Sequence, residues 1–415
     1  MFPRRTNGQI GPAWNAIVCV DWGKDRAKRR AWIADVEQRT VVPLEVPTTV
    51  REILAYAAER PGRTLVGIDA ALGVPASYFE SARTEVGAWR EASDFPAWLV
   101  AAMAHPGFRD EARSAADWRL DRPFIAVPAG VGSLGAFWER AGGRLLRQID
   151  VATGAKCVFV VSGIPGTVGS GTRELWKELV PLLTGERSFG IWPFDGSLDA
   201  MPDRRVVLAE IYPRVCYALA LAPSLPAPLE SIAKVVAAAR DTATTRLKHA
   251  GWLRSHGVRV DAMERARGDE DDFDAMMSAA GLLRCVLDGS ALDGPSANAV
   301  EGGILGLESL SLRPPRSPST PRPRVSKVAP QDPGVSRVEP PALPVARVKA
   351  SECAPTGAPQ FHCPIPDCGK VFLGSRGGWD AHVASLRMHP GWHPAVGDPK
   401  QRKAIFEAEF ASWFC

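Results

Sequence analysis

The sequence predicts an α/β fold, in which a mixed sheet carries helices on both faces. Short apolar runs rich in β-branched residues, typical of buried strands, recur along the first 300 residues. Stretches with apolar residues at helical spacing lie between them. Three strands, a helix and a further strand, followed by alternating helices and strands, form the order expected of such a sheet. With 46% apolar residues, the chain has enough of them to build a core.

The predicted elements can be justified in chain order. "AIVCVDWG", "RAWIADVE" and "TVVPLEV" are β-rich runs, "TVREILAYAAER" has helical apolar spacing, and "TLVGIDAALG" is again a buried type of strand. "KCVFVVSG" and "RVVLAEIYP" predict later strands around the helix "TRELWKELVPLL". A last helix begins at "DEDDFDAMMSAAGLLRCVL", whose core-facing residues are Phe273, Met276, Met277, Ala280, Leu283 and Leu287.

Neither a membrane span nor export is expected. No run of 18 apolar residues occurs, and the start "MFPRRTNGQIGPAW" lacks the apolar core of a secretory signal. Cys19, Cys157, Cys216 and Cys285 each stand alone in apolar surroundings, as small buried residues do. We therefore expect a soluble, cytoplasmic protein without a disulfide scaffold.

The basic character of the chain is concentrated in one segment. The net charge is +4, yet residues 1–310 hold 36 Lys and Arg against 38 Asp and Glu. Residues 311–350 hold eight basic residues, two acidic residues and ten prolines. This composition cannot bury enough apolar surface to offset the entropy of ordering, so it predicts a disordered linker. The expected layout is a domain at 14–300, a Pro/Arg-rich linker at 308–358, a small module at 361–394 and a short C-terminal helix at 398–415.

Five acidic residues are placed where they can meet. Asp21 and Asp69 end apolar strands, and an α/β sheet places its chemistry at the carboxyl ends of its strands. Glu210 interrupts a third apolar strand, which is a costly place for a charge. Asp271 and Asp274 are three residues apart on one side of the last helix. Taken singly, the aspartates also suit turns, caps or a helix N-terminus.

Taken together, these residues predict a site for divalent cations. Clustered carboxylates raise one another's pKa unless a cation neutralises them. Oxygen ligands without His or Cys suit magnesium or manganese. Two such ions about 4 Å apart hold a phosphodiester and generate the attacking hydroxide. The pattern therefore indicates phosphoryl transfer.

The order "VCVDWG", "VGIDAALG" and "DDFDAMMSAA" resembles the ribonuclease H fold, and the closing helix is similar to that of Holliday junction resolvases. "GIDAALGVP", "VSGIPGTVGSGTRELWKEL", "AEIYPR" and "DDFDAM" together resemble the bacterial family called domain of unknown function 429, a predicted nuclease group, over residues 14–290. The resemblance implies a metal-dependent nuclease. It implies Asp21, Asp69 and Asp274 as metal ligands, with Asp271 and Glu210 as supporting carboxylates. The region between Asp69 and Glu210 is longer than in the simplest members of the fold.

The module near the C-terminus has the spacing of a zinc site. Four residues separate Cys363 from Cys368, thirteen separate Cys368 from His382, and six separate His382 from His389. These four residues are the predicted zinc ligands of a two-Cys two-His zinc finger, with a hairpin bearing the thiolates. The gap between the two histidines exceeds the usual three to five residues, so His393 is an alternative fourth ligand. Few basic residues lie on the helix of this finger, which leaves nucleic-acid and protein recognition both open.

Two further stretches have alternative interpretations. "GIPGTVGSGT" before a helix indicates either an anion site or an ordinary turn capped by Ser170 or Thr172. The basic stretch "RDTATTRLKHAGWLRSHGVRV" indicates either contacts to a phosphate backbone or a solvated helix face.

Three functions remain open from the sequence. The first is a magnesium- or manganese-dependent nuclease with a zinc finger that recognises nucleic acid or a protein partner. The second is a non-catalytic nucleic-acid or protein adaptor with a degenerate site. The third is a phosphotransferase acting on a small phosphorylated molecule, although no nucleoside-triphosphate loop is present.

Overall fold

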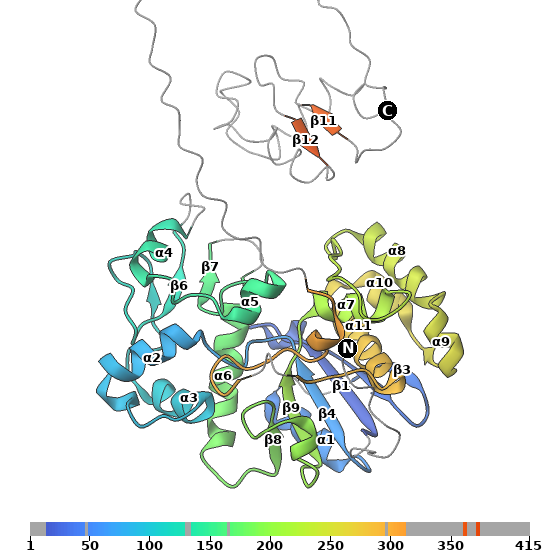
Figure 1. The fold of residues 1–415 in the computed structure, drawn as a ribbon, viewed down its shortest axis with the longest axis horizontal. Helices are drawn as coiled ribbons and strands as arrows, with labels where there is room; N and C mark the ends of the chain where they lie inside the picture. The colour runs from blue at the N-terminus through green and yellow to red at the C-terminus, as the bar shows by residue number, and fades with distance from the viewer. Residues whose placement is uncertain are drawn as a thin grey trace, which may run out of the picture. The chain divides into compact units, whose positions relative to one another are not determined.

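A computed structural model describes residues 14–45, 49–128, 134–163, 167–294, 298–312, 360–362 and 371–373 (Figure 1). The chain divides into two compact units, residues 1–322 and 323–415. Within the described ranges, every helix is too short or too polar to cross a membrane.

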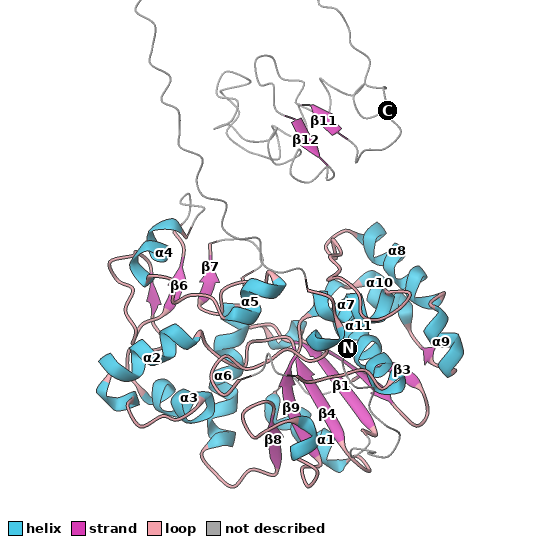
Figure 2. Cartoon of the chain, viewed as in Figure 1, coloured by secondary structure: helices cyan, strands magenta, loops and turns pink. Residues whose placement is uncertain are grey.

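The first unit is built on a seven-stranded sheet in the order β10-β3-β2-β1-β4-β9-β8 (Figure 2). β1, β2 and β3 are antiparallel neighbours, whereas the pairs β1–β4, β4–β9, β9–β8 and β3–β10 are parallel. This mostly parallel sheet flanked by helices confirms the predicted α/β class. Its strands are β1 (Ala16–Asp21), β2 (Arg30–Asp35), β3 (Thr40–Leu44), β4 (Thr64–Ile68), β8 (Phe189–Ile191), β9 (Val206–Glu210) and β10 (Arg259–Val260).

Helices cover both faces of this sheet. Along β1, Ile17 and Cys19 belong to the core that includes α11 and α7, whereas Val18 and Val20 belong to the core that includes α1. Successive side chains of a strand point to opposite faces, so one apolar strand supplies both cores. The helices are α1 (Val50–Glu59), α2 (Ala76–Glu85), α3 (Phe95–Ala104), α4 (Gly135–Ala141), α5 (Gln148–Thr153), α6 (Gly169–Leu183), α7 (Pro213–Leu221), α8 (Ala237–Lys248), α9 (Gly251–His256), α10 (Met263–Gly268) and α11 (Glu270–Asp288).

A smaller sheet and several helices are inserted between β4 and β9, and α2, α3 and α4 lie at the left of Figure 1. β5 (Glu111–Ala112), β6 (Phe124–Ala126) and β7 (Val160–Ser162) form a parallel sheet. The indole of Trp98 meets Trp89 and Trp176 edge to face in an aromatic core beside it. The strand predicted by "KCVFVVSG" is thus present as β7, but it belongs to this smaller sheet.

The domain continues beyond its predicted end at residue 300. Leu305, Leu307 and Leu310 are buried, and the Ser311 N–H donates to the Ala227 carbonyl oxygen at 2.8 Å. The linker therefore begins later than the predicted residue 308, because these leucines precede the proline-rich stretch and pack into the core. The remainder of the predicted linker, 313–358, lies outside the described residues.

In the second unit the structure describes one pair of short strands. β11 (Gln360–His362) pairs with β12 (Val371–Leu373) in antiparallel fashion. The zinc site and the C-terminal helix stay predictions. The residues of these predictions that lie outside the described ranges are Cys363, Cys368, His382, His389, His393 and 398–415.

Candidate metal centre

Three of the five predicted acidic residues converge at one edge of the central sheet. Asp21 is the last residue of β1, and Asp69 directly follows β4. These strands are parallel neighbours with Val20 opposite Ile68, so both carboxylates emerge at the same edge. α11 brings Asp274 to the same place. One carboxylate oxygen from each of the three aspartates lies within 4.8 Å of the other two.

The loop that carries Asp69 is held by several hydrogen bonds. The Asp69 N–H donates to the Val20 carbonyl oxygen at 2.9 Å. The Trp176 indole N–H of α6 donates to the Ala71 carbonyl oxygen at 2.8 Å, and the Ala71 N–H donates to the Thr172 hydroxyl oxygen at 3.3 Å. Helix α6 of the inserted region therefore helps to position a carboxylate of the central sheet.

Glu210 was predicted to support the metal ligands, but its contacts give it another role. Its carboxylate accepts two hydrogen bonds from the Arg147 guanidinium, both at 2.7 Å, and one from the Leu72 N–H at 2.8 Å. Arg147 also pairs with Asp150 at 2.8 Å, and all three charged side chains are buried. Glu210 is thus neutralised by an arginine and braces the loop after Asp69, instead of supporting a metal ion.

The other acidic residues of α11 have separate roles. Asp269 caps the helix by accepting hydrogen bonds from the Asp271 and Asp272 N–H groups. Asp272 is buried and accepts a hydrogen bond from the Trp32 indole at 2.8 Å, which fixes α11 on β2. Burial raises the pKa of Asp274, and the charge of the half-buried Asp271 adds to this rise, but Asp271 does not belong to the converging triad.

Two residues that the sequence analysis did not identify contact the triad. The Tyr217 hydroxyl of α7 donates to Oδ1 of Asp274, and the Lys234 ammonium pairs with Oδ2. A buried tyrosine needs a partner for its hydroxyl, so the apolar setting of Tyr217 was a usable signal. Lys234 has no spacing relationship to the aspartates, and nothing in the sequence marks it.

Electrostatics at the site reflect three carboxylates crowded in a poorly solvated place. Burial, followed by the charge of Asp274, raises the pKa of Asp69 to about 8. Burial, then the charges of Asp274 and Asp69, raises the pKa of Asp21 well above its usual value. Burial lowers the pKa of Lys234, but the charge of Asp274 outweighs it and leaves that pKa above its usual value. The triad therefore favours binding a cation or a proton.

The free energy of unfolding of the metal-free protein should fall as pH rises from about 4 to about 8. In this window the folded state keeps a proton on Asp69, whose pKa is raised from 3.8 to about 8, while the unfolded chain has lost it. Asp21 acts in the same direction. Denaturant unfolding at several pH values measures this slope. Asp69→Asn should flatten it, and an equal slope in parent and variant would contradict the assignment.

The glycine-rich entry to α6 is explained by close packing. A Cβ on Gly169 would lie 2.6 Å from the Val160 carbonyl oxygen, and one on Gly171 would lie 2.7 Å from that of Trp22. The helix begins after Val168 without a side-chain cap, so the predicted cap by Ser170 or Thr172 is wrong. The Thr172 hydroxyl is directed to the loop after Asp69 instead.

The basic stretch around α8 is partly used for internal contacts. Arg240 is buried and donates to the carbonyl oxygens of Lys234 and Arg267 at 2.5 and 2.8 Å. Arg246 pairs with Glu230. Arg240 and Arg246, two basic residues of this stretch, are therefore engaged within the fold.

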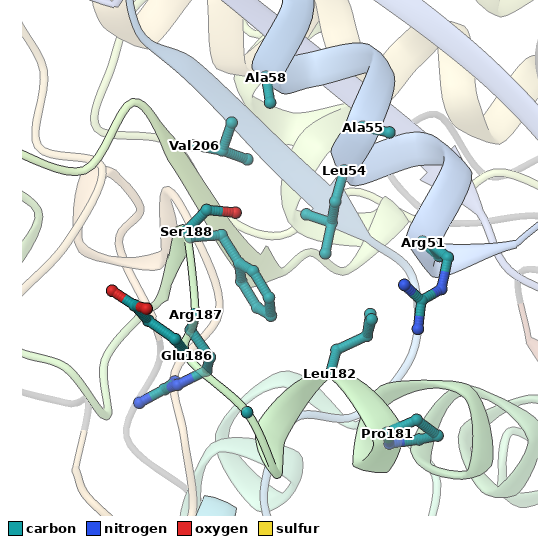
Figure 3. A pocket seen from close by; sticks show the side chains of 12 residues that line it. Arg51, Leu54, Ala55, Ala58, Pro181, Leu182, Glu186, Arg187, Ser188 and Val206 are labelled. Atoms are coloured by element: carbon teal, nitrogen blue, oxygen red, sulfur yellow. The ribbon is translucent and has the colours of Figure 1, made fainter.

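Two surface pockets flank the sheet. A pocket of about 290 Å³ lies between α1 and the segment joining α6 to β8, and Figure 3 shows Leu54 and Leu182 in its lining. It reaches Val206, the first residue of β9, and is therefore at the opposite end of the strands from the triad. A second pocket, of about 320 Å³, includes Val20 of β1 and Arg30 of β2, which lies opposite Asp21 in the strand register. Its charged lining residues are Arg26, Arg29, Arg30, Arg265, Glu45 and Asp272.

Comparisons of the chain with protein-family models, with curated proteins and with solved structures find no match. The resemblance to the domain of unknown function 429 family stays a prediction.

Proposed function

We propose that the first unit is a magnesium- or manganese-dependent nuclease of ribonuclease H-like fold, in which Asp21, Asp69 and Asp274 bind the metal. The observation that carries this proposal is the convergence of three carboxylates from β1, the end of β4 and α11 within 4.8 Å. The Lys234 ammonium paired with Asp274 is a stand-in cation at the same place. Both features fit a site for a hard divalent ion.

The path of the chain supports the fold assignment. Antiparallel β1, β2 and β3 are followed by α1 and by β4, which is parallel to β1. This is the order by which the sequence resembles the ribonuclease H fold. The closing helix α11 then returns an aspartate to the end of β1.

The residues of the site have distinct tasks in this proposal. A bound divalent ion polarises a phosphodiester and lowers the pKa of bound water. Asp21 and Asp69 are half-buried, whereas Asp274 is buried and oriented by Tyr217, so an ion would reach the site from the side of Asp21 and Asp69.

The second unit adds recognition to this proposal. Zinc bound by Cys363, Cys368, His382 and His389 would stabilise a module too small to fold by burial alone. A basic linker joined to such a finger raises the local concentration of a nucleic-acid substrate at a catalytic domain with little positive charge of its own. We place this activity in the cytoplasm.

Metal titration tests the proposal most directly. Calorimetric titration of magnesium or manganese should show binding to the parent, and none to an Asp21→Asn plus Asp69→Asn variant. Cleavage of single- and double-stranded DNA and RNA, with metal and with chelator, should follow the same pattern. Arg187→Met, a surface change far from the triad, is the matched control and should retain both properties.

The second candidate is a non-catalytic adaptor, and the ion pair between Lys234 and Asp274 is the observation that favours it, because an ammonium already neutralises part of the triad. Equal binding of metal to parent and variant, or binding to neither, supports the adaptor over the nuclease.

A further inference from the structure

Lys234 enters the triad from outside the helices and strands. It lies on the segment that joins α7 to α8. Its side chain is 34% exposed, whereas the Asp274 side chain that it meets is 2% exposed. The lysine therefore reaches from the surface to a buried carboxylate, and its ammonium lies at the boundary between the site and solvent.

The backbone of Lys234 is held in place. Its carbonyl oxygen accepts a hydrogen bond from the buried Arg240 guanidinium at 2.5 Å, and its N–H donates to the Ile232 carbonyl oxygen at 2.8 Å. Arg240 also donates to the Arg267 carbonyl oxygen, shortly before α11 begins. The segment is thus tied to the end of α10, and the ammonium is directed at the triad by the fold.

Both oxygens of Asp274 are engaged as a result. Oδ1 accepts from Tyr217 and Oδ2 pairs with Lys234. A magnesium ion needs a carboxylate oxygen at about 2.0 to 2.1 Å. An ammonium and a divalent ion at the same oxygen repel each other strongly in a poorly solvated site, so the two cations exclude each other there.

We propose that Lys234 is a displaceable counter-ion of the triad: its ammonium occupies Oδ2 of Asp274 before metal binds, and a divalent cation must expel it. This inference rests on the proposed metal site and deepens it. The lysine keeps the three carboxylates together in the metal-free protein. It also lowers the affinity for metal, so it sets the concentration of divalent ion at which the site fills.

The surroundings of Lys234 allow such a release. The next two residues, Val235 and Val236, are 75% and 49% exposed. The ammonium can therefore withdraw toward solvent by side-chain rotation without repacking a core, while Arg240 still holds the backbone. Displacement requires no change in the helices or strands.

Calorimetric titration of magnesium and of manganese into the full chain tests the proposal. Lys234→Met should lower the dissociation constant for the divalent ion by about tenfold, because the variant has no ion pair to break and no ammonium to repel the ion. Lys248→Met, which removes an exposed lysine of α8, is the matched control and should leave the constant unchanged. Metal that binds Lys234→Met no more tightly than the parent would overturn this inference while leaving the proposed nuclease site in place.

A second readout uses the unaltered protein, so it does not depend on the variant folding. Reaction of lysines with an amine-modifying reagent, followed by mass spectrometry, should show Lys234 becoming more reactive when magnesium is added, with Lys248 unchanged. Unchanged reactivity of Lys234 in metal-loaded protein contradicts displacement. If neither the parent nor Lys234→Met binds metal, the proposed function fails and this inference fails with it.

Discussion

Replacing Arg147 with methionine should destabilise the first unit by about 3 to 5 kcal/mol. The variant leaves two buried carboxylates, Glu210 and Asp150, without the guanidinium that now donates to both at 2.7 to 3.1 Å. An uncompensated buried charge is among the largest single penalties that a substitution introduces. Denaturant unfolding of parent and variant measures the difference.

A matched arginine on the surface gives the control for this substitution. Arg187 makes two hydrogen bonds of 3.0 Å to Asp195, but both side chains are about a quarter exposed. Arg187→Met should therefore cost less than about 1 kcal/mol. Similar losses for the two variants would show that the Arg147 network is not the buried brace described above.

The Asp274→Asn variant should cleave at least about 100-fold more slowly in the presence of metal. Loss of a residue that only supports a metal ligand costs up to about 100-fold, and Asp274 is proposed to be a ligand itself. The amide has the shape of the carboxylate but lacks its charge, so the variant keeps a partner for Tyr217 and weakens the metal site. Initial rates at saturating magnesium, measured on the substrate that the parent cleaves, test the prediction.

The stability of the same variant separates a functional role from a structural one. Asp274→Asn removes one of three mutually repelling carboxylates and also the ion pair with the part-exposed Lys234. Because these two effects oppose each other, the free energy of unfolding of the metal-free protein should stay within about 1 kcal/mol of the parent. Tyr217→Phe, which removes one donor and keeps the charge, should reduce cleavage less than Asp274→Asn does. A large loss of stability in Asp274→Asn would instead assign Asp274 to the packing of α11.

The fold was predictable from the sequence where local pattern dominates. The apolar runs that end at Asp21 and Asp69 predict two strands with a carboxylate at the carboxyl end of each, and the parallel pairing of β1 with β4 in the structure places these two residues side by side. The apolar spacing along α11 likewise predicts a helix with a core-facing side. These local patterns supply the three carboxylates, and the tertiary structure brings them together.

Other parts of the site depend on contacts between distant residues. Glu210 is the last residue of β9 and not the interruption of a strand that the sequence indicated, yet Arg147, 63 residues away, determines its role. The strand over "KCVFVVSG" has a correct local pattern, but its pairing partner is β6 and not a strand of the central sheet. A local pattern cannot specify which distant partner a side chain or a strand meets.

By itself, the sequence determined the α/β class, the strand-end positions of Asp21 and Asp69, and the helix that carries Asp274, because apolar periodicity and burial act over a few residues. Only the tertiary structure decided that Arg147 neutralises Glu210 and that the Lys234 ammonium reaches Asp274. Both pairings arise from the path of loops whose direction is set by packing, and no local spacing encodes where such a loop returns.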